Sequence, residues 1–302
     1  MSEAKSRIYF SSNVDIDTRE SLSDVLGFSS TPNIGNYLEI PLRVTGDSSN
    51  EFNFILDRVK QKLVGWKANL LSLAGRNVLI QASTAAIPSY VMQCNLLPRR
   101  ILDGIDRVNH DFLWDTTESI RKIHWVRWHK VTKPKEEGGL GLQTARGRNI
   151  AMLAKRNWRL NTEKEAPWAK VLQAKYCNNR RLNAANANKL PCSWTWKAIK
   201  KGREVFTQGS MWMVGRDSML SFWHGKWMKQ GPLRHLIQGR LTRGASNWAI
   251  KDIMVDSGID WNRVPFVFPP EIKHVLQATP LSLIGRSGDK LVWVANPKGS
   301  FD

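Results

Sequence analysis

The stretch Phe52-Asn-Phe-Ile-Leu-Asp-Arg-Val-Lys-Gln-Lys-Leu63 decides the fold class of this 302-residue chain. Its apolar side chains recur at i, i+3, i+4, i+7 and i+11, the pattern of an amphipathic α-helix with one buried face. Two similar stripes follow, one over residues 70–82 and one over 101–112. Because short connections favour packing between neighbouring helices, we predict a three-helix bundle within 51–114.

Helical periodicity also dominates the rest of the chain, where extended segments are few. Further helical patterns cover 150–160, 168–176, 194–206, 249–258 and 271–276. Short extended pieces are expected near the N-terminus, at 7–11 and 37–42, and residues 211–223 are typical of a β-hairpin around a turn at 215–217. We therefore predict a mainly α protein with short β pieces at the N-terminus and a β-hairpin near 211–223.

The composition, 42% hydrophobic and 9% aromatic, is that of a folded protein and excludes a disordered chain. No apolar run approaches the roughly 18 residues needed to cross a bilayer, and no apolar segment of signal-peptide length follows Met1. The three cysteines Cys94, Cys177 and Cys192 are too few and too scattered for a disulfide framework or a metal pair. We expect an intracellular protein with reduced thiols and no membrane association.

The net charge of +19 is concentrated in one region. Residues 121–203 carry 21 basic and 4 acidic side chains, whereas residues 1–120 carry 12 basic and 14 acidic ones. A local excess of this kind concentrates a polyanion, and contacts to phosphates release counterions. The region 121–203 is therefore the candidate nucleic-acid-binding part of the chain.

Positively charged side chains in this region fall on one side of a predicted helix. The spacings of 3, 4 and 7 among Arg148, Lys155, Arg156 and Arg159 produce this arrangement. The candidate nucleic-acid-binding residues are Arg146, Arg148, Lys155, Arg156, Arg159, Arg121, Lys122 and Arg127. A solvated helix face without a ligand is the alternative interpretation of the same pattern.

Tryptophan is abundant in the same basic region. The chain has 14 tryptophans, of which Trp125, Trp128, Trp158, Trp168, Trp194 and Trp196 lie between 121 and 203. Flat aromatic rings between basic residues suit single-stranded nucleic acid, because bases stack on the rings while phosphates pair with the cations. Tryptophans at helical spacing usually pack in the core, however, and we expect most of these six to do so.

Patterns typical of catalytic sites do not occur in the sequence. It has no Gly-x-Ser-x-Gly, P-loop or His-Glu-x-x-His motif. The densest group of carboxylates is Asp103, Asp106, Asp111 and Asp115, where the first two share a helix face and the rest are expected to be solvated. We therefore expect no catalytic residues, no metal site and no cofactor in this chain.

Several short segments of the sequence match, in the same order, the motifs of one known protein family. The segment Leu63-Val-Gly-Trp-Lys-Ala-Asn-Leu-Leu-Ser-Leu-Ala-Gly-Arg76 is very close to that family's pattern. Further matches are Lys5-Ser-Arg-Ile-Tyr-Phe-Ser, Tyr37-Leu-Glu-Ile-Pro-Leu, Ile87-Pro-Ser-Tyr-Val-Met, Phe112-Leu-Trp114, Lys133-Pro-Lys-Glu-Glu-Gly-Gly-Leu-Gly-Leu, Leu153-Ala-Lys-x-x-Trp158-Arg and the region from Trp212 to Trp223. Together these segments resemble plant non-LTR (LINE-type) retrotransposon reverse transcriptases, and the resemblance runs over nearly the whole chain.

The resemblance implies four regions. They are a remnant of the polymerase palm (1–45), a thumb-like helical bundle (46–120), a basic, Trp-rich helical connection (121–206) and a small α+β segment (207–302) that ends at the truncated start of a zinc-binding region. The family polymerase binds Mg²⁺ through two adjacent aspartates, and no Asp-Asp pair occurs here. The resemblance therefore implies a nucleic-acid-binding fragment that is inactive alone, with Mg²⁺ required only by the intact RNA-directed DNA polymerase, a family also linked to RNase H.

The implied partner is an RNA/DNA template–primer, and the implied location is intracellular, nuclear or cytoplasmic; the sequence leaves the oligomeric state open. Two other functions also remain open. A host could retain the chain as a helical interaction module without enzymatic activity, or the chain could be the non-functional product of a decayed element.

Overall fold

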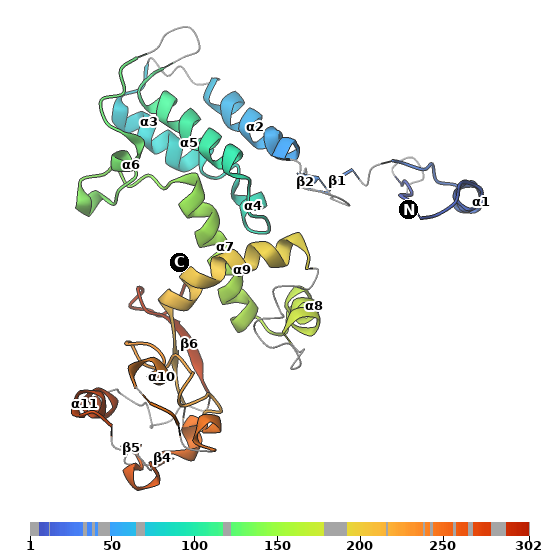
Figure 1. Cartoon of the computed structure of the whole chain (residues 1–302). Coiled ribbons are helices and arrows are strands. Elements are labelled where there is room, and N and C mark those ends of the chain that lie inside the picture. Colours follow the sequence, from blue (N-terminus) through green and yellow to red (C-terminus); the bar gives the residue numbers. More distant parts are fainter. Residues whose placement is uncertain are drawn as a thin grey trace. The chain divides into compact units, whose positions relative to one another are not determined.

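The computed structural model describes residues 6–11, 13–32, 35–37, 40–41, 49–64, 70–116, 122–177, 192–215, 217–237, 239–241, 244–255, 258–264, 268–278 and 288–301. In these ranges the protein is mainly α with short β pieces, as predicted (Figure 1). The chain forms two compact units. Unit 1 comprises 1–91 and 97–146, and unit 2 comprises 92–96 and 147–302. No helix in the described ranges is long and apolar enough to cross a membrane.

Unit 1 begins with a short helix and a small hairpin. Helix α1 (Ile16–Leu26) starts at Asp15, whose carboxylate accepts the Thr18 N–H at 2.9 Å, and it ends at Gly27 in the left-handed conformation. Strands β1 (Asn36–Tyr37) and β2 (Ile40–Pro41) pair antiparallel. The extended piece expected at 37–42 is therefore present as two short strands, whereas the piece expected at 7–11 contributes only an isolated bridge between Ile8 and Ser30.

The helical bundle of unit 1 is built on the predicted stripe. A 3₁₀ turn (Ser49–Phe52) leads into α2 (Asn53–Val64), which packs on α5 (Arg99–Leu113). The side chains that this contact buries repeat with the helical period; they are Ile55 and Val59 on α2, and Ile101 and Ile105 on α5. The two helices come close at Gly104, where an added Cβ would lie 2.9 Å from Leu56 Cδ2.

The middle helix of the bundle is shorter than its apolar stripe predicts. Helix α3 (Leu73–Leu79) begins at Ser72, whose hydroxyl accepts the Gly75 N–H, and it continues into a π-helical turn (Ile80–Thr84) and α4 (Ser89–Met92). The buried Thr84 hydroxyl lies 2.8 Å from Asn109 Oδ1 and 3.0 Å from the Ile80 carbonyl oxygen. These polar contacts link the widened turn to α5.

Unit 1 ends in a turn-rich segment. It contains the short helix α6 (Trp128–Val131) and a 3₁₀ turn (Lys135–Glu137) that Gly138 closes in the left-handed conformation. The Asp106 carboxylate on α5 accepts the Ala145 N–H at 2.9 Å, at the point where α7 (Ala145–Thr162) begins. A carboxylate at a helix N-terminus satisfies an otherwise unpaired N–H and interacts favourably with the helix dipole.

Unit 2 is organised around three helices and a two-stranded sheet (Figure 1). Helix α7 is followed by α8 (Pro167–Tyr176), which starts with proline at its first position, and by α9 (Trp194–Gly209). Strand β3 (Ser210–Met213) continues directly from α9. It pairs antiparallel with β6 (Lys290–Trp293), in a register that places Ser210 opposite Trp293.

The predicted pairing of the hairpin at 211–223 is wrong. The strand over 210–213 is present, but its ladder partner is β6, and Ser221 instead forms an isolated bridge with Ala249. Residues 222–224 turn away because Phe222 and Trp223 enter the core of unit 2, where both are fully buried. Burial of these two large rings outweighs the local alternation that favoured a hairpin.

The remaining elements of unit 2 are short and surround this core. They are α10 (Leu233–Leu236), 3₁₀ turns at Ala245–Asn247, Ile250–Asp252 and Trp261–Arg263, the antiparallel strands β4 (Met254–Val255) and β5 (Gly258–Ile259), and α11 (Pro270–Ala278). Helix α11 confirms the pattern at 271–276. The helix expected over 249–258 is replaced by a 3₁₀ turn and β4, because Asp252 accepts the Ala249 N–H at 2.9 Å and closes a tight turn.

Candidate nucleic-acid interface

The basic region is presented mainly by α7 and α9, which cross at close range. An added Cβ on Gly202 of α9 would lie 2.4 Å from the Leu153 carbonyl carbon and 2.5 Å from the Ala154 nitrogen. Next to this crossing, the buried Asn157 side chain donates from Nδ2 to the Ile199 carbonyl oxygen at 2.7 Å. Backbone contact together with a buried hydrogen bond holds the two helices in a fixed arrangement.

The N-terminal part of α7 is tied to a neighbouring segment of unit 2. The fully buried Asn149 donates from Nδ2 to the carbonyl oxygens of Met92 and Asn95, each at 2.9 Å. At the other end of α7, Gln173 of α8 donates to the Leu160 carbonyl oxygen at 2.9 Å. Helix α7 is therefore held at both ends, and the side chains on its exposed face project from a rigid support.

Two of the predicted binding residues, Arg156 and Arg159, are used inside unit 2. Their guanidinium carbons lie 5.4 and 5.6 Å from the centre of the Trp168 ring. Arg156 also donates to the Gln93 carbonyl oxygen at 3.3 Å, and Arg159 forms a two-pronged ion pair with Glu163 at 2.7 and 2.9 Å. The hydrogen bonds with Glu163 raise the pKa of Arg159 and lower the pKa of Glu163. Both arginines thus join α7 to its surroundings.

The other three predicted residues on α7 differ in exposure. Arg148 is half-buried, and burial lowers the pKa of its guanidinium. Arg146 and Lys155 are exposed, and neither side chain has a hydrogen bond or ion pair with any residue that the structure describes. Their charge is therefore available to an external anion.

The predicted residues that precede α7 lie in unit 1. Lys122 is engaged, because its ammonium group pairs with the Asp115 carboxylate, which also forms an ion pair with Arg76 at 3.2 Å. Arg127 is exposed at the start of α6, and its guanidinium group has no hydrogen bond or ion pair to the described part of the chain. Arg121 lies outside the described residues.

The sequence analysis missed cations on α9. Lys197 and Lys201 are exposed and four positions apart, so they share a helix face. Lys197 Nζ lies 4.7 Å from the ring centre of Trp194, a residue that is 41% exposed, and the Lys201 ammonium group has no hydrogen bond or ion pair within the described ranges. The sequence does contain a signal for these cations, because the two lysines are spaced i, i+4 beside a tryptophan inside the basic region.

Lys155 and Lys201 lie next to each other across the helix crossing. Each is one residue from the pair that meets there, Ala154 and Gly202. From standard backbone dimensions their Cα atoms are at most about 13 Å apart. We refer to Lys155, Lys197 and Lys201 as the α7–α9 cations.

The expectation that most tryptophans of the basic region are core residues is wrong. None of the six is fully buried, whereas Trp223 and Trp227, which lie outside the basic region, are 0% and 3% exposed. Trp125 is 78% exposed, and Trp196 stacks on Tyr176 with ring centres 4.6 Å apart. The other rings are half-buried or partly exposed, and Trp128 packs against the core of unit 1 without being fully buried.

The four aspartates of the densest carboxylate group, which lie on or beside α5, do not form a donor set suited to Mg²⁺. Asp103 and Asp111 pair with arginines one turn away, Asp106 caps α7, and Asp115 is held by Arg76 and Lys122. Asp115 is buried, so the expectation that it is solvated is wrong, and the hydrogen bond from Lys122 lowers its pKa. Among the described residues, no group of three or more His, Cys, Asp or Glu side chains is placed to hold a metal ion.

Comparison with known proteins identifies plant relatives of this mainly α, locally basic chain. No protein-family model matches it. The Arabidopsis thaliana protein named "Putative ribonuclease H protein At1g65750" is 34% identical over 257 residues, which cover 84% of this chain. The chain spans only 42% of the length of that relative.

A second relative is matched over nearly its whole length. The "Uncharacterized mitochondrial protein AtMg00310" of Arabidopsis thaliana is 30% identical over 150 residues, which are 49% of this chain and 97% of that protein. The chain therefore belongs to the same family as AtMg00310.

Proposed function

We propose that this chain is the nucleic-acid-holding part of a plant retrotransposon reverse transcriptase, and that the α7–α9 cations contact the sugar–phosphate backbone of an RNA/DNA template–primer. The observation that carries the proposal is the placement of exposed lysines on two helices that cross in backbone contact at Gly202. Contacts of this kind hold a duplex without reading its sequence. The resemblance of the sequence motifs supports this origin, and the first relative is named a putative ribonuclease H protein, an activity to which the resembled family is also linked.

The proposal is tested by binding of the full chain to a labelled RNA/DNA hybrid. We expect the triple variant Lys155→Ala/Lys197→Ala/Lys201→Ala to bind the hybrid roughly tenfold more weakly at moderate salt, because three phosphate contacts are removed. The control Lys229→Ala/Arg240→Ala/Lys251→Ala removes three exposed charges elsewhere in unit 2, and should bind like the unaltered chain. Equal weakening by both triple variants would contradict the proposal.

We place the joining of nucleotides outside this chain, because the carboxylates of its densest acidic group, Asp103, Asp106, Asp111 and Asp115, are engaged by arginines, lysine or a backbone amide. A primer-extension assay of the chain with Mg²⁺ and deoxynucleotides should show no incorporation above background. Incorporation by the purified chain would assign it a polymerase activity and overturn this part of the proposal.

A second candidate function is a protein-interaction module, which the surface of α1 favours. This helix buries none of its residues, and Ile16 and Val25 are 69% and 78% exposed. Apolar side chains gathered on one exposed helix can mark a protein contact. Concentration-dependent self-association in sedimentation velocity that Val25→Glu removes, without any loss of hybrid binding, would favour this function.

A further inference from the structure

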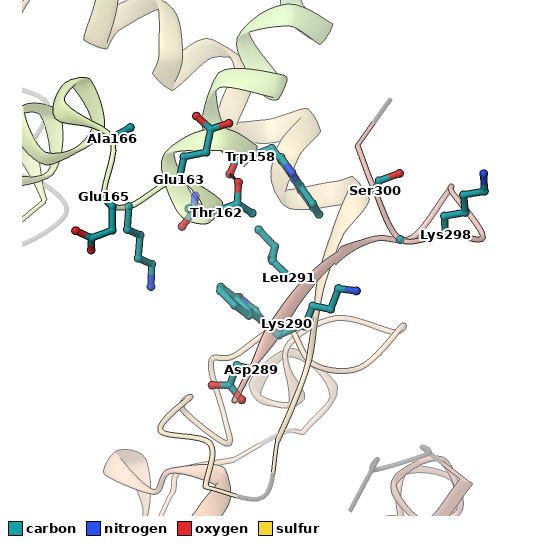
Figure 2. A pocket seen from close by; sticks show the side chains of 14 residues that line it. Trp158, Thr162, Glu163, Glu165, Ala166, Asp289, Lys290, Leu291, Lys298 and Ser300 are labelled. Atoms are coloured by element: carbon teal, nitrogen blue, oxygen red, sulfur yellow. Dashed lines mark hydrogen bonds between the residues drawn. The ribbon is translucent and has the colours of Figure 1, made fainter. Parts of the chain in front are cut away.

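Unit 2 contains an open groove of about 740 Å³ that the α7–α9 cations do not line. One wall is the C-terminal end of α7 with the connection to α8, and the other is formed by β3, β6 and the turn that follows β6. Figure 2 shows Trp158 and Thr162 on the first wall, and Lys290, Leu291 and Lys298 on the second. A volume of this size lies within the roughly 300–1,000 Å³ of small-ligand sites, enough for a nucleotide or two but not for a duplex.

Flat aromatic surfaces line the groove and are held in place. Trp158 is half-buried, and its ring meets Trp293 edge-on and Phe301 at a tilt, with centres 6.4 and 6.1 Å apart. Trp293 is itself fixed, because its ring packs against Gly209. A Cβ added to Gly209 would lie 2.0 Å from Cη2 of the Trp293 ring. Trp212 of β3 also lines the groove and lies opposite Leu291 in the sheet. Rings fixed in this way can stack with a planar group at little entropic cost.

The charges of the groove are unbalanced although acids and bases both line it. Each lining carboxylate is engaged: Glu163 pairs with Arg159, Glu165 pairs with Lys170 at 2.7 Å, and Asp289 accepts the Gly215 N–H at 3.1 Å. The lysines Lys164, Lys290 and Lys298 are exposed, and none of their ammonium groups has a hydrogen bond or ion pair in the described part of the chain. Asp289 keeps its negative charge, because a backbone N–H does not neutralise it, so three lysines without ionic partners face one such carboxylate. The groove therefore carries an excess of positive charge beside aromatic rings.

We propose that this groove binds a single-stranded segment of nucleic acid, with a base stacked on Trp158 or Trp212 and phosphates at Lys290 and Lys298. The inference rests on the proposed function, that the chain binds nucleic acid, and adds a second site with a different ligand form. Only an unpaired strand can present the face of a base to such a ring, because bases in a duplex are already stacked. The planar bases of a single strand match the aromatic rings of the groove, and its repeated phosphates match the lysines.

The test uses the full chain and two labelled ligands, a twelve-nucleotide oligothymidylate and an RNA/DNA hybrid. We expect Lys290→Gln/Lys298→Gln to bind oligothymidylate roughly tenfold more weakly and the hybrid within about twofold of the unaltered chain. The control Lys229→Gln/Lys251→Gln should bind both ligands normally. Photo-crosslinking of an oligonucleotide that carries 5-iodouracil should label Trp158 or Trp212.

Normal oligothymidylate binding by the groove variant, Lys290→Gln/Lys298→Gln, would overturn the inference. So would crosslinks confined to other parts of the chain. A third contradicting result is displacement of oligothymidylate by an acidic, tyrosine-containing peptide that binds more tightly. Failure of the proposed function is recorded separately, by the hybrid affinity of the Lys155→Ala/Lys197→Ala/Lys201→Ala variant. A single-strand defect in the groove variant, with normal hybrid binding, supports the groove even if the α7–α9 cations prove inert.

Discussion

The cations around α5 in unit 1 and the cations at the α7–α9 crossing in unit 2 differ in whether an acidic side chain pairs with them. In unit 1, Arg99 pairs with Asp103 at 3.3 Å, and Arg76 and Lys122 share the buried Asp115. In unit 2, the exposed Lys155 and Lys201 have no such partner among the described residues. For binding an external polyanion, a cation that the fold already pairs with a carboxylate counts for little. Only cations without such a partner remain available.

The largest loss of stability should come from removing the charge of Asp115, which pairs with Arg76 and Lys122 in unit 1. Asp115→Asn leaves the buried Arg76 without its ion pair, and we expect a loss of about 3 kcal/mol in the free energy of unfolding at pH 7. Asparagine tolerates the positive φ of 60° at this position, so backbone strain does not contribute. Urea unfolding followed by circular dichroism measures the difference.

This loss should depend on pH. The pKa of Asp115 in the folded protein is below its ordinary value of 3.8, so its stabilisation is present above about pH 4 and disappears as the pH falls through the lowered pKa. The deficit of Asp115→Asn should therefore shrink between pH 5 and pH 2. The exposed Asp103→Asn serves as control and should cost less than about 0.5 kcal/mol at any pH. Equal deficits for both variants would contradict this account of unit 1.

The two close helix crossings should respond differently to the same substitution. Gly202→Ala places a Cβ 2.4 Å from backbone in unit 2 and should destabilise the protein by about 2–3 kcal/mol. Gly104→Ala in unit 1 meets only the end of the Leu56 side chain, which can rotate away, and the better helix propensity of alanine offsets the cost. Thermal unfolding of both variants checks the contrast. Similar melting temperatures would show that α7 and α9 are not in backbone contact.

Neighbouring residues on α7 should separate stability from binding. Arg156→Ala removes contacts with Gln93 and Trp168 and should cost about 1–2 kcal/mol of unfolding free energy, with little change in the salt dependence of binding. Lys155→Ala should leave stability unchanged within about 0.5 kcal/mol and weaken hybrid binding roughly threefold. Parallel urea and binding titrations measure both quantities. The reverse pattern would contradict the assignment of Arg156 as structural and Lys155 as exposed to ligand.

Much of the helical framework could be predicted from the sequence, because it depends on local periodicity. The stripes at 52–63 and 101–112 correspond to α2 and α5, and the patterns at 150–160, 168–176 and 194–206 correspond to α7, α8 and α9. The pairing of β3 with β6 joins residues nearly eighty positions apart. Alternation within a short segment carries no information about such a distant partner.

The candidate site was harder to predict than the helices that carry it. Helical spacing correctly grouped Arg156 and Arg159 with Lys155, but spacing does not show that Trp168 and Gln93 engage the two arginines. The i, i+4 spacing of Arg159 and Glu163 predicts an ion pair, so Arg159 could have been left out of the candidate binding residues. The groove could not be predicted, because Trp158 and Lys290 meet only after β6 pairs with β3.

The most direct test of the central claim is the slope of the logarithm of hybrid affinity against the logarithm of salt concentration, measured with the full chain. Exposed lysines that contact phosphates predict a steep negative slope, and the Lys155→Ala/Lys197→Ala/Lys201→Ala variant should reduce its magnitude by about 2 to 3. A slope that is flat, or one that the variant leaves unchanged, would contradict the claim that α7 and α9 hold a nucleic-acid backbone.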